Sequence, residues 1–356
     1  MTDHSHNRPL DFAVIGHQDS WQNIHRLVNG MRSNDKVSLS MENIKDIYSY
    51  IPPRSIFKMN VRSKTGAEIK GAYIETFINP DELDTKYLRG NIKKVNEAIY
   101  TAQKLNAKIV ALGGFTSIVL EGNFNAFETS HTKLTTGNTL TSAYILKGIE
   151  NVISKQNIKL SDCNILIIGA TGDIGMACAN YLKTKVRQLL LCARNKKRLE
   201  AYSSTLTKQN FNVKHSTLLN ELIVDADIII SVASSNDIVI QNCKKPVIIC
   251  DAGYPKNLDQ KIGKESNVFL FHGGMGQIQF GYDFNPDYKS HFYNYPAPDI
   301  AHGCILEAVI LAFENKLENY SLGKGNISNY KIEEIYQMAL KHGLNVAPFY
   351  NAQGLC

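Results

Sequence analysis

The sequence has little that would place it in a membrane or in an oxidising compartment. No apolar run approaches the ~18 residues that a membrane-spanning helix needs. The opening MTDHSHNRPLDF is polar and lacks the apolar core of a secretory signal. The seven cysteines form no CxxC pair, and several lie in apolar, strand-like runs. We therefore expect a cytoplasmic protein with reduced, mostly buried thiols, no metal site and no integral membrane segment.

Strong charge and compositional bias are also missing. The formal net charge of +6 is too mild to indicate a nucleic-acid-binding protein, although it would suit an acidic partner. Apolar residues make up 44% and charged residues 20%, which excludes a disordered chain. No internal repeat is visible, and 356 residues at about 150 per domain indicate two or three domains.

The clearest pattern is a strand, a glycine turn, a helix and a second strand, which together make a βαβ unit. Continuous apolar runs of this length are typical of strands buried on both faces of a parallel sheet. Alternation of strands and helices indicates a doubly wound sheet. Buried strands are expected at 164–168, 188–193, 228–234 and 247–253, and the first helix at about 176–185.

These patterns predict an α/β fold in three parts. Residues 1–157 form an N-terminal α/β substrate-binding domain, with glycine-ended strands at 12–16 and 108–114. Residues 158–290 form a Rossmann-like, parallel-sheet NADPH-binding domain. Residues 291–356 form a C-terminal helical segment that contains Cys304. Its first helix, at 305–313, is apolar nearly all round and should be buried.

The glycine turn predicts a dinucleotide site, because backbone N–H groups at a helix start can approach a pyrophosphate. The spacing is G-x-x-G-x-x-G, and its place between a strand and a helix supports a ligand role over simple helix packing. The ends of two later strands complete the site. The predicted residues are Gly169, Ala170, Thr171, Gly172, Asp173, Ile174 and Gly175, with Ala233, Ser234 and Gly253.

The end of the second strand indicates which nicotinamide cofactor binds. NAD sites usually place an acidic residue there, but this chain has Arg194 and Asn195, with Arg198 shortly after. Arginine can bind a 2′-phosphate with two hydrogen bonds, so NADPH is the predicted cofactor. A solvated basic helix start explains the intervening Lys196 and Lys197 equally well.

Two reacting groups are compatible with such a cofactor. A Tyr-x-x-x-Lys pair, as in short-chain dehydrogenases acting on a ketone or alcohol, occurs three times, and only Tyr320/Lys324 lies far downstream of the glycine turn. The other group is Cys304, which follows His302 and Gly303 and opens the apolar helix. A thiolate there would be stabilised by free N–H groups and the helix dipole. Residue chemistry alone leaves Cys304 open between nucleophile and core cysteine.

Several ordered segments of this chain resemble the long-chain acyl-(acyl-carrier-protein) reductases of cyanobacterial type, which make fatty aldehydes. These segments are FAVIGH (12–17), ALGGFTSIV (111–119), TTGNT (135–139), GATGDIG (169–175), ARN (193–195), GYPKNLD (253–259), CILEA (304–308) and LAFE (311–314). The resemblance implies that Cys304 becomes acylated and that NADPH reduces the acyl group to an aldehyde. It also implies an acyl carrier protein as the substrate-bearing partner.

Other roles follow from this reading. Backbone N–H groups at the Cys304 helix start, or the Ser117 hydroxyl, would stabilise the oxyanion, although Ser117 is equally expected to stabilise its turn. Lys and Arg residues over 86–108 could dock the acidic carrier or could be a solvated helix face. An aldehyde-consuming enzyme or a membrane surface would be further partners. The rival from another class is a non-catalytic, nucleotide-sensing protein.

The aromatic tract at 280–295 departs from the resemblance. Its side chains could line or shorten an acyl channel, so the acyl-chain preference stays open at this point. A variable surface crossover is the equally expected alternative.

Overall fold

The chain folds into two compact units. A computed structural model describes residues 9–32, 37–120, 131–233, 238–241, 243, 246–254, 256, 258, 267–289, 295–323 and 325–356. The first unit comprises Met1–Gly137, Ile278–Asn326 and Gln337–Asn345. The second comprises Asn138–Gln277, Ile327–Tyr336 and Val346–Cys356. Each unit is described by itself below.

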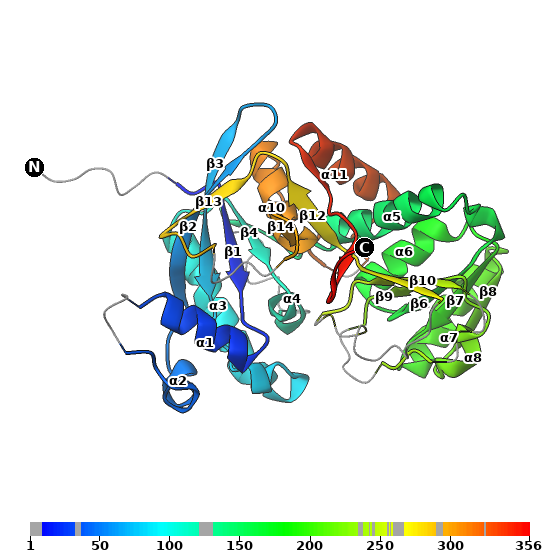
Figure 1. The fold of residues 1–356 in the computed structure, drawn as a ribbon, viewed down its shortest axis with the longest axis horizontal. Helices are drawn as coiled ribbons and strands as arrows, with labels where there is room; N and C mark the ends of the chain where they lie inside the picture. Colours follow the sequence, from blue (N-terminus) through cyan, green and yellow to red (C-terminus); the bar gives the residue numbers. More distant parts are fainter. Residues whose placement is uncertain are drawn as a thin grey trace, which may run out of the picture. The chain divides into compact units, whose positions relative to one another are not determined.

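The first unit is built on a six-stranded mixed sheet of order β13-β2-β3-β1-β4-β5 (Figure 1). The strands β3, β1, β4 and β5 pair in parallel, whereas β2 and β13 add to the β3 edge in antiparallel fashion. The carboxyl ends of the parallel strands meet at one edge. The strands are β1 (Phe12–Gly16), β2 (Arg54–Arg62), β3 (Glu68–Glu75), β4 (Ile109–Leu112), β5 (Lys133–Thr135) and β13 (Tyr282–Asn285).

Helices cover this sheet because its strands are apolar on both faces. Helix α3 buries Val95, Ala98, Ile99 and Ala102 in a core shared with alternate residues of β1, β3 and β4. Helix α10 packs against β1, β3, β4 and β5. The helical elements are α1 (Trp21–Gly30), α2 (Met41–Tyr48), η2 (Pro80–Glu82), η3 (Thr85–Tyr87), α3 (Leu88–Lys104), α4 (Phe115–Val119) and α10 (Gly303–Phe313), and the short strand β14 (Ile300–His302) precedes α10.

The second unit is a six-stranded, fully parallel sheet of order β11-β10-β9-β6-β7-β8. The chain starts at the central β6 and winds outward in both directions, which confirms the predicted Rossmann-like topology. Its elements are α5 (Asn138–Lys155), η5 (Leu160–Asp162), β6 (Asn164–Ile168), α6 (Asp173–Leu182), β7 (Gln188–Cys192), α7 (Lys196–Lys208), β8 (Val213–Ser216), α8 (Asn220–Ile223), β9 (Ile228–Ser231), β10 (Val247–Asp251), β11 (Val268–His272), β16 (Tyr350–Asn351) and β17 (Gly354–Leu355).

The division of the chain differs from the expected boundaries at 157/158 and 290/291. The first unit ends at Gly137, so the whole of α5 belongs to the second. The predicted helical segment 291–356 is not a separate body, because it is shared between the two units and also contains strands. Three elements span a boundary between units: β12 (Met275–Ile278), α11 (Asn329–Lys341) and β15 (Leu344–Val346).

The packing of α10 explains why the units differ from the expected domains. The helix buries seven of its eleven residues, so it needs cover on nearly every side. The sheet of the first unit supplies that cover, so the chain returns to the first unit at Ile278, before the last two segments of the second unit. In the part of the chain that the structure describes, no helix is long and apolar enough to cross a membrane.

Candidate active site

Cys304 is the second residue of α10, in the first helical turn. His302 occupies the N-cap position without a side-chain cap hydrogen bond, so the first N–H groups of the helix remain available. The backbone N–H groups of Gly114, Ile305 and Cys304 itself lower the pKa of the thiol. Cys304 is partly exposed. The thiol therefore lies at an open helix start, in the field of backbone N–H groups.

The electrostatic balance at this thiol differs from the one expected at a helix start. Burial raises the pKa of Cys304, the three N–H donors lower it, and the carboxylate of Glu307 raises it again, with a net upward shift. His302, which the sequence placed near the thiol, is not among the described groups that act on it. Its Nε2 lies 3.0 Å from the Tyr295 hydroxyl instead. The resting sulfur is held as a thiol.

A buried polar cluster backs the Cys304 turn. Glu307, one helical turn along α10, is fully buried and accepts hydrogen bonds from the hydroxyl groups of Thr135 and Ser321. Thr135 Oγ1 also accepts from the Gly137 N–H at 3.1 Å. Any Cβ at Gly137, whose φ is +71°, would overlap the Cys304 backbone. The TTG segment thus fixes the start of α10, a role that no local sequence signal shows.

Ser117, the other predicted catalytic residue, lies in the short helix α4 after the Gly113–Gly114 turn. Its Oγ donates a hydrogen bond to the Gly114 carbonyl oxygen at 2.9 Å. The Ser117 hydroxyl therefore stabilises its own turn, which is the alternative role that the sequence predicted for it. The backbone of Gly114, rather than the serine hydroxyl, is among the groups that lower the pKa of Cys304.

In the second unit, the glycine turn has the close packing that a phosphate-binding turn needs. Gly169 follows β6 with a φ of +88°, and a Cβ there would lie 2.9 Å from the Ala233 nitrogen. A Cβ at Gly175 would overlap the Gly169 carbonyl oxygen, so α6 packs directly on the turn. Gly172 is exposed at the N-cap of α6 and leaves the helix start open. Ala170, Thr171, Asp173 and Ile174 lie between these glycines.

The later strands bring further predicted residues to the same edge. A Cβ at Gly253 would lie 2.8 Å from the Ala233 carbonyl oxygen, so the loops after β6, β9 and β10 converge. The buried Asp251 carboxylate orders the last loop by accepting from the N–H groups of Gly253 (3.2 Å) and Leu258 (3.3 Å). Burial raises the pKa of Asp251. Ser234 lies outside the described residues.

The residues that follow β7 divide into two roles. Asn195 caps α7, since its Oδ1 accepts the Arg198 N–H at 3.0 Å. Arg194 and Arg198 are exposed. Their guanidinium groups are thus available beside the helix cap, where the sequence predicts the 2′-phosphate. An open helix start, converging loops and exposed arginines fit an NADP-type dinucleotide, whose nicotinamide supplies the hydride when it is bound.

The rival Tyr320/Lys324 pair lacks the geometry that its chemistry requires. Tyr320 is fully buried, and residues 317–323 contain no helix that would align the two side chains on one face. Lys324 lies outside the described residues. Among the described residues, no cluster of His, Cys, Asp or Glu could hold a metal ion.

Comparison with known proteins relates the chain to several reductases and dehydrogenases. Residues 151–272, within the second unit, match the family described as shikimate/quinate 5-dehydrogenase. A glutamyl-tRNA reductase of Chloroherpeton thalassium is 27% identical over 40% of this chain and 33% of its own length. The aminotransferase PigE of Serratia is 25% identical over 81% of this chain and 34% of its own length.

One match extends over nearly the whole chain, to the long-chain acyl-[acyl-carrier-protein] reductase of Synechococcus elongatus. It is 31% identical over 345 residues, which are 93% of this chain and 97% of the relative. Such coverage includes the Cys304 turn of the first unit as well as the glycine turn of the second. The protein is an NAD(P)-dependent oxidoreductase and belongs to the long-chain acyl-[acyl-carrier-protein] reductase family.

Proposed function

We propose that this protein reduces a long-chain acyl thioester, carried by an acyl carrier protein, to a fatty aldehyde with NADPH. The observation that carries the proposal is the place of Cys304 in the first turn of α10, a helix whose N-cap, His302, makes no side-chain cap hydrogen bond. An open helix start favours a nucleophile over a core cysteine, because its free N–H groups stabilise a thiolate. The family membership supplies the substrate class.

Acylation is the first step. The Cys304 sulfur, after losing its proton, attacks the thioester carbonyl, and the carbonyl π electrons move onto oxygen. The N–H groups of Gly114 and Ile305 are the candidate donors to this oxyanion. Collapse breaks the bond to the carrier's sulfur, which leaves as a thiolate and takes up a proton. The product is an acyl–Cys304 thioester.

Reduction follows at the same carbon. Hydride addition to the acyl–Cys304 thioester gives a tetrahedral thiohemiacetal anion, held by the same N–H donors. Its collapse releases the aldehyde and returns the Cys304 thiolate. The sulfur is thus nucleophile in the first half and leaving group in the second, so an unusually stable thiolate is not required. A reducing compartment such as the cytoplasm keeps this thiol available.

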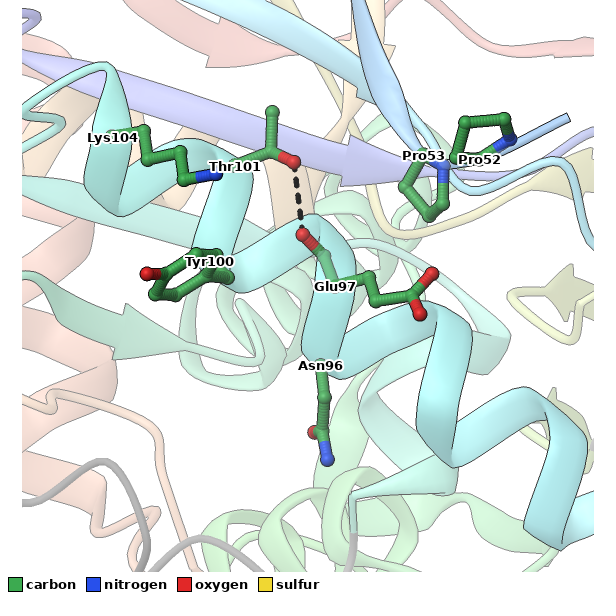
Figure 2. A pocket seen from close by; sticks show the side chains of 7 residues that line it. All are labelled: Pro52, Pro53, Asn96, Glu97, Tyr100, Thr101 and Lys104. Atoms are coloured by element: carbon green, nitrogen blue, oxygen red, sulfur yellow. Dashed lines mark hydrogen bonds between the residues drawn. The ribbon is translucent and has the colours of Figure 1, made fainter.

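The carrier would dock along one face of α3, which we call the basic stripe: Arg89, Lys93 and Lys104. All three are exposed and follow helical spacing, whereas Lys94 donates to the Phe77 carbonyl and Lys108 pairs with Asp11 at 2.8 Å. Lys104, at one end of the stripe, lines an open pocket of about 400 Å³ together with Glu97 (Figure 2). Its wall includes Tyr100, 59% exposed, with the Lys104 ammonium 4.7 Å from the ring centroid. Positive charge beside an exposed ring suits an acidic helical protein.

Mass spectrometry tests the acyl-enzyme directly. Incubation with a long-chain acyl-carrier thioester without NADPH should add one acyl mass, which maps to a peptide containing Cys304 and disappears when NADPH is added. Cys304→Ala should abolish both adduct and aldehyde while NADPH still binds. Tyr320→Phe should leave aldehyde formation within about twofold, since this mechanism needs no phenol acid. Aldehyde formation by Cys304→Ala at the wild-type rate would refute the proposal.

A further inference from the structure

The start of α10 is joined to the end of β5 at two points that lie one helical turn apart. At the first point two backbones are in contact, because a Cβ at Gly137 would lie 2.1 Å from the Cys304 Cα and 2.3 Å from its carbonyl oxygen. At the second point, the fully buried Glu307 carboxylate accepts a hydrogen bond from the Thr135 hydroxyl. Residues three apart in a helix are neighbours on its surface, so both points lie on one face of α10.

One side chain, Thr135, connects the two points. Its Oγ1 donates to Glu307 and accepts the Gly137 N–H at 3.1 Å, so the hydroxyl group is used in both directions. Thr135 is also the last residue of β5 and pairs with Ala111 of β4, which fixes it to the sheet. The contacts therefore close a ring that runs along the first turn of α10 and returns through Thr135 and Gly137. We call this ring the β5 tie.

A second hydroxyl holds the carboxylate in place. Ser321 donates to the same oxygen of Glu307, and its own carbonyl oxygen accepts from the Thr136 hydroxyl at 3.1 Å. Close by in sequence, the Asn319 side chain accepts the Leu134 N–H at 2.8 Å. The segment that contains Ser321 is thus bonded to β5 and to the residue that follows it. Glu307 accepts from two hydroxyl groups that are both attached to this strand.

These polar contacts fix what apolar packing leaves less restricted. Burial of apolar surface is non-directional, whereas a hydrogen bond requires a particular distance and angle. Attachment at two points on one face, a turn apart, therefore fixes the rotation of α10 about its axis. That rotation decides where a side chain in the first turn lies, and Cys304 is such a side chain.

We propose that Glu307 and Thr135 are positioning residues, which hold Gly137 against the Cys304 backbone and so set the rotation of α10 at which the sulfur meets the acyl group. Neither side chain touches the reacting atoms in this scheme. The inference rests on the proposed function and deepens it, since it assigns the placement of the nucleophile to two named side chains. All the residues of the β5 tie belong to the first unit.

The carboxylate also acts on the thiol through its charge, and this effect can be separated from its position. The negative charge of Glu307 raises the pKa of Cys304. A glutamine at this place keeps an oxygen that can accept from both hydroxyl groups, but it carries no charge. Glu307→Gln therefore removes the charge and retains the β5 tie.

The variants distinguish the tie from general stability. Thr135→Val keeps the shape of the side chain and removes the hydroxyl, and Thr135→Ser restores the hydroxyl. Glu307→Met removes the acceptor, and Glu307→Gln restores it. The matched control is Thr132→Val, since Thr132 is also buried and its hydroxyl donates to the Ala107 carbonyl oxygen at 2.8 Å. Each variant is assayed for kcat, KM, thermal unfolding and amide hydrogen exchange of the peptide that covers 303–307.

Thr135→Val and Glu307→Met should each lower kcat by about tenfold to a hundredfold with KM within about twofold, since a misplaced nucleophile acts mainly on the chemical step. Both should also speed amide exchange at 303–307. Thr135→Ser and Glu307→Gln should recover most of the lost kcat, and Thr132→Val should stay near wild type. Glu307→Gln should in addition lower the pH midpoint of Cys304 alkylation by iodoacetamide by about half a unit, because it removes a nearby negative charge.

Folded Thr135→Val and Glu307→Met proteins with wild-type kcat and wild-type exchange would overturn the proposal. A loss of kcat that Thr132→Val shares, or that Thr135→Ser does not recover, would also overturn it, because the loss would then come from general destabilisation. If Thr135→Val does not fold, Thr135→Ala is compared with Thr135→Ser by the same readouts.

The readouts also distinguish this inference from the proposed function. Amide exchange needs no turnover, so it reports on the β5 tie even if Cys304 proves not to be acylated. Absence of an acyl adduct in the wild type would refute the proposed function, whereas unchanged exchange at 303–307 in Thr135→Val would refute the tie alone.

Discussion

The Cys304 thiol shows how one residue can be reactive without being ionised at rest. Burial and Glu307 outweigh three backbone N–H groups, and the pKa rises. The backbone N–H groups of an open helix start still stabilise the negative charge that develops on sulfur or on the adjacent oxygen. The site therefore suits a sulfur that attacks and later leaves. A neutral thiol is also protected from adventitious oxidation, because oxidants react with the thiolate.

The first prediction concerns the pH dependence of this thiol. Alkylation of Cys304 by iodoacetamide should increase with pH, with a midpoint above the ~8.5 of an unperturbed thiol. The sign follows from burial, which favours the neutral form and moves ionisation upward. Peptide mapping distinguishes Cys304 from the exposed Cys356, which serves as the reference thiol for the reagent. A Cys304 midpoint below 8 would contradict the raised pKa (about half a unit below the unperturbed value).

The second prediction concerns Arg194. Its exposed guanidinium follows β7, where a dinucleotide's 2′-phosphate would lie. Hydrogen bonds to a charged group are worth about 1.5–3 kcal/mol, so Arg194→Ala should raise the Kd of NADPH by about tenfold to a hundredfold. The Kd of NADH should change less than about threefold, because NADH lacks that phosphate.

The control for Arg194 is Lys196→Ala. Lys196 is also exposed and basic, but its ammonium lies 3.9 Å from the Glu200 carboxylate. In that variant, the Kd values of NADPH and NADH should both stay near those of the wild-type protein. Equal affinities of the wild-type protein for NADPH and NADH would remove the basis of the assignment.

At the scale of elements, α3 carries a prediction about the carrier protein. Reversing the charge with Lys93→Glu should raise KM for an acyl-carrier substrate about tenfold, and KM for acyl-coenzyme A should change much less. High salt should raise KM for the carrier substrate in the wild type, because exposed charges are screened beyond about 3 Å at 1 M. The matched control is Lys58→Glu on β2, an exposed lysine of the same unit. Salt-independent KM would show that the stripe is only a solvated face.

Most elements were predictable because their signals are local. Buried strands such as β6 and β10 are continuous apolar runs, and α10 is apolar on nearly every side. The expected start of the glycine-turn helix at about 176 was wrong by three residues, since α6 begins at Asp173. The first turn of α6 contains an aspartate and a glycine. Neither is a strong helix former, so the sequence pattern did not indicate a helix there.

At the scale of the whole molecule, the sequence showed the glycine turn and the Cys304 helix but not their supports. Contacts between Glu307 and Ser321, or between His17 and Phe115, join chain segments that have no common pattern. The same limit applies to the division into units, because the return of 278–326 to the first unit depends on packing between distant segments. Long-range contacts of this kind leave no periodic pattern in the sequence from which they could be predicted.

A second buried group in the first unit, Glu75, links pH to overall stability. It ends β3 with no exposure, and burial raises its pKa to about 7. Its carboxyl group accepts from Gln18 (2.9 Å), Tyr73 (2.9 Å) and Tyr48 (3.3 Å), and from the Phe77 N–H at 3.3 Å. Burial lowers the pKa of Lys94, and the charges of Glu82 and Glu75 act against that lowering. The fold therefore holds Glu75 protonated over a range in which the unfolded chain is already ionised.

The sign of the resulting effect on stability is fixed. Between an unfolded pKa of about 4.3 and a folded pKa of about 7, the folded state binds more protons, so the free energy of unfolding falls as pH rises. From pH 5 to pH 8 this one group should cost about 2–3 kcal/mol. His17 acts in the opposite sense. Burial lowers the pKa of His17 in the fold. Its contribution to the free energy of unfolding is therefore lost as pH falls below the unfolded pKa of about 6.5.

The last prediction isolates Glu75 from these other groups. Urea unfolding of wild type and Glu75→Gln, measured from pH 5 to pH 8, should give two stability curves that differ in slope. The wild type should lose about 2–3 kcal/mol relative to the variant, because only the wild type must ionise a buried carboxyl group. An offset between the curves is expected, since the Gln amide cannot accept at both positions. Glu68→Gln, at an exposed site on the same strand, should leave the slope unchanged. Parallel curves for wild type and Glu75→Gln would mean that Glu75 is ionised throughout, and the four donors around it, rather than its proton, would then satisfy the buried charge.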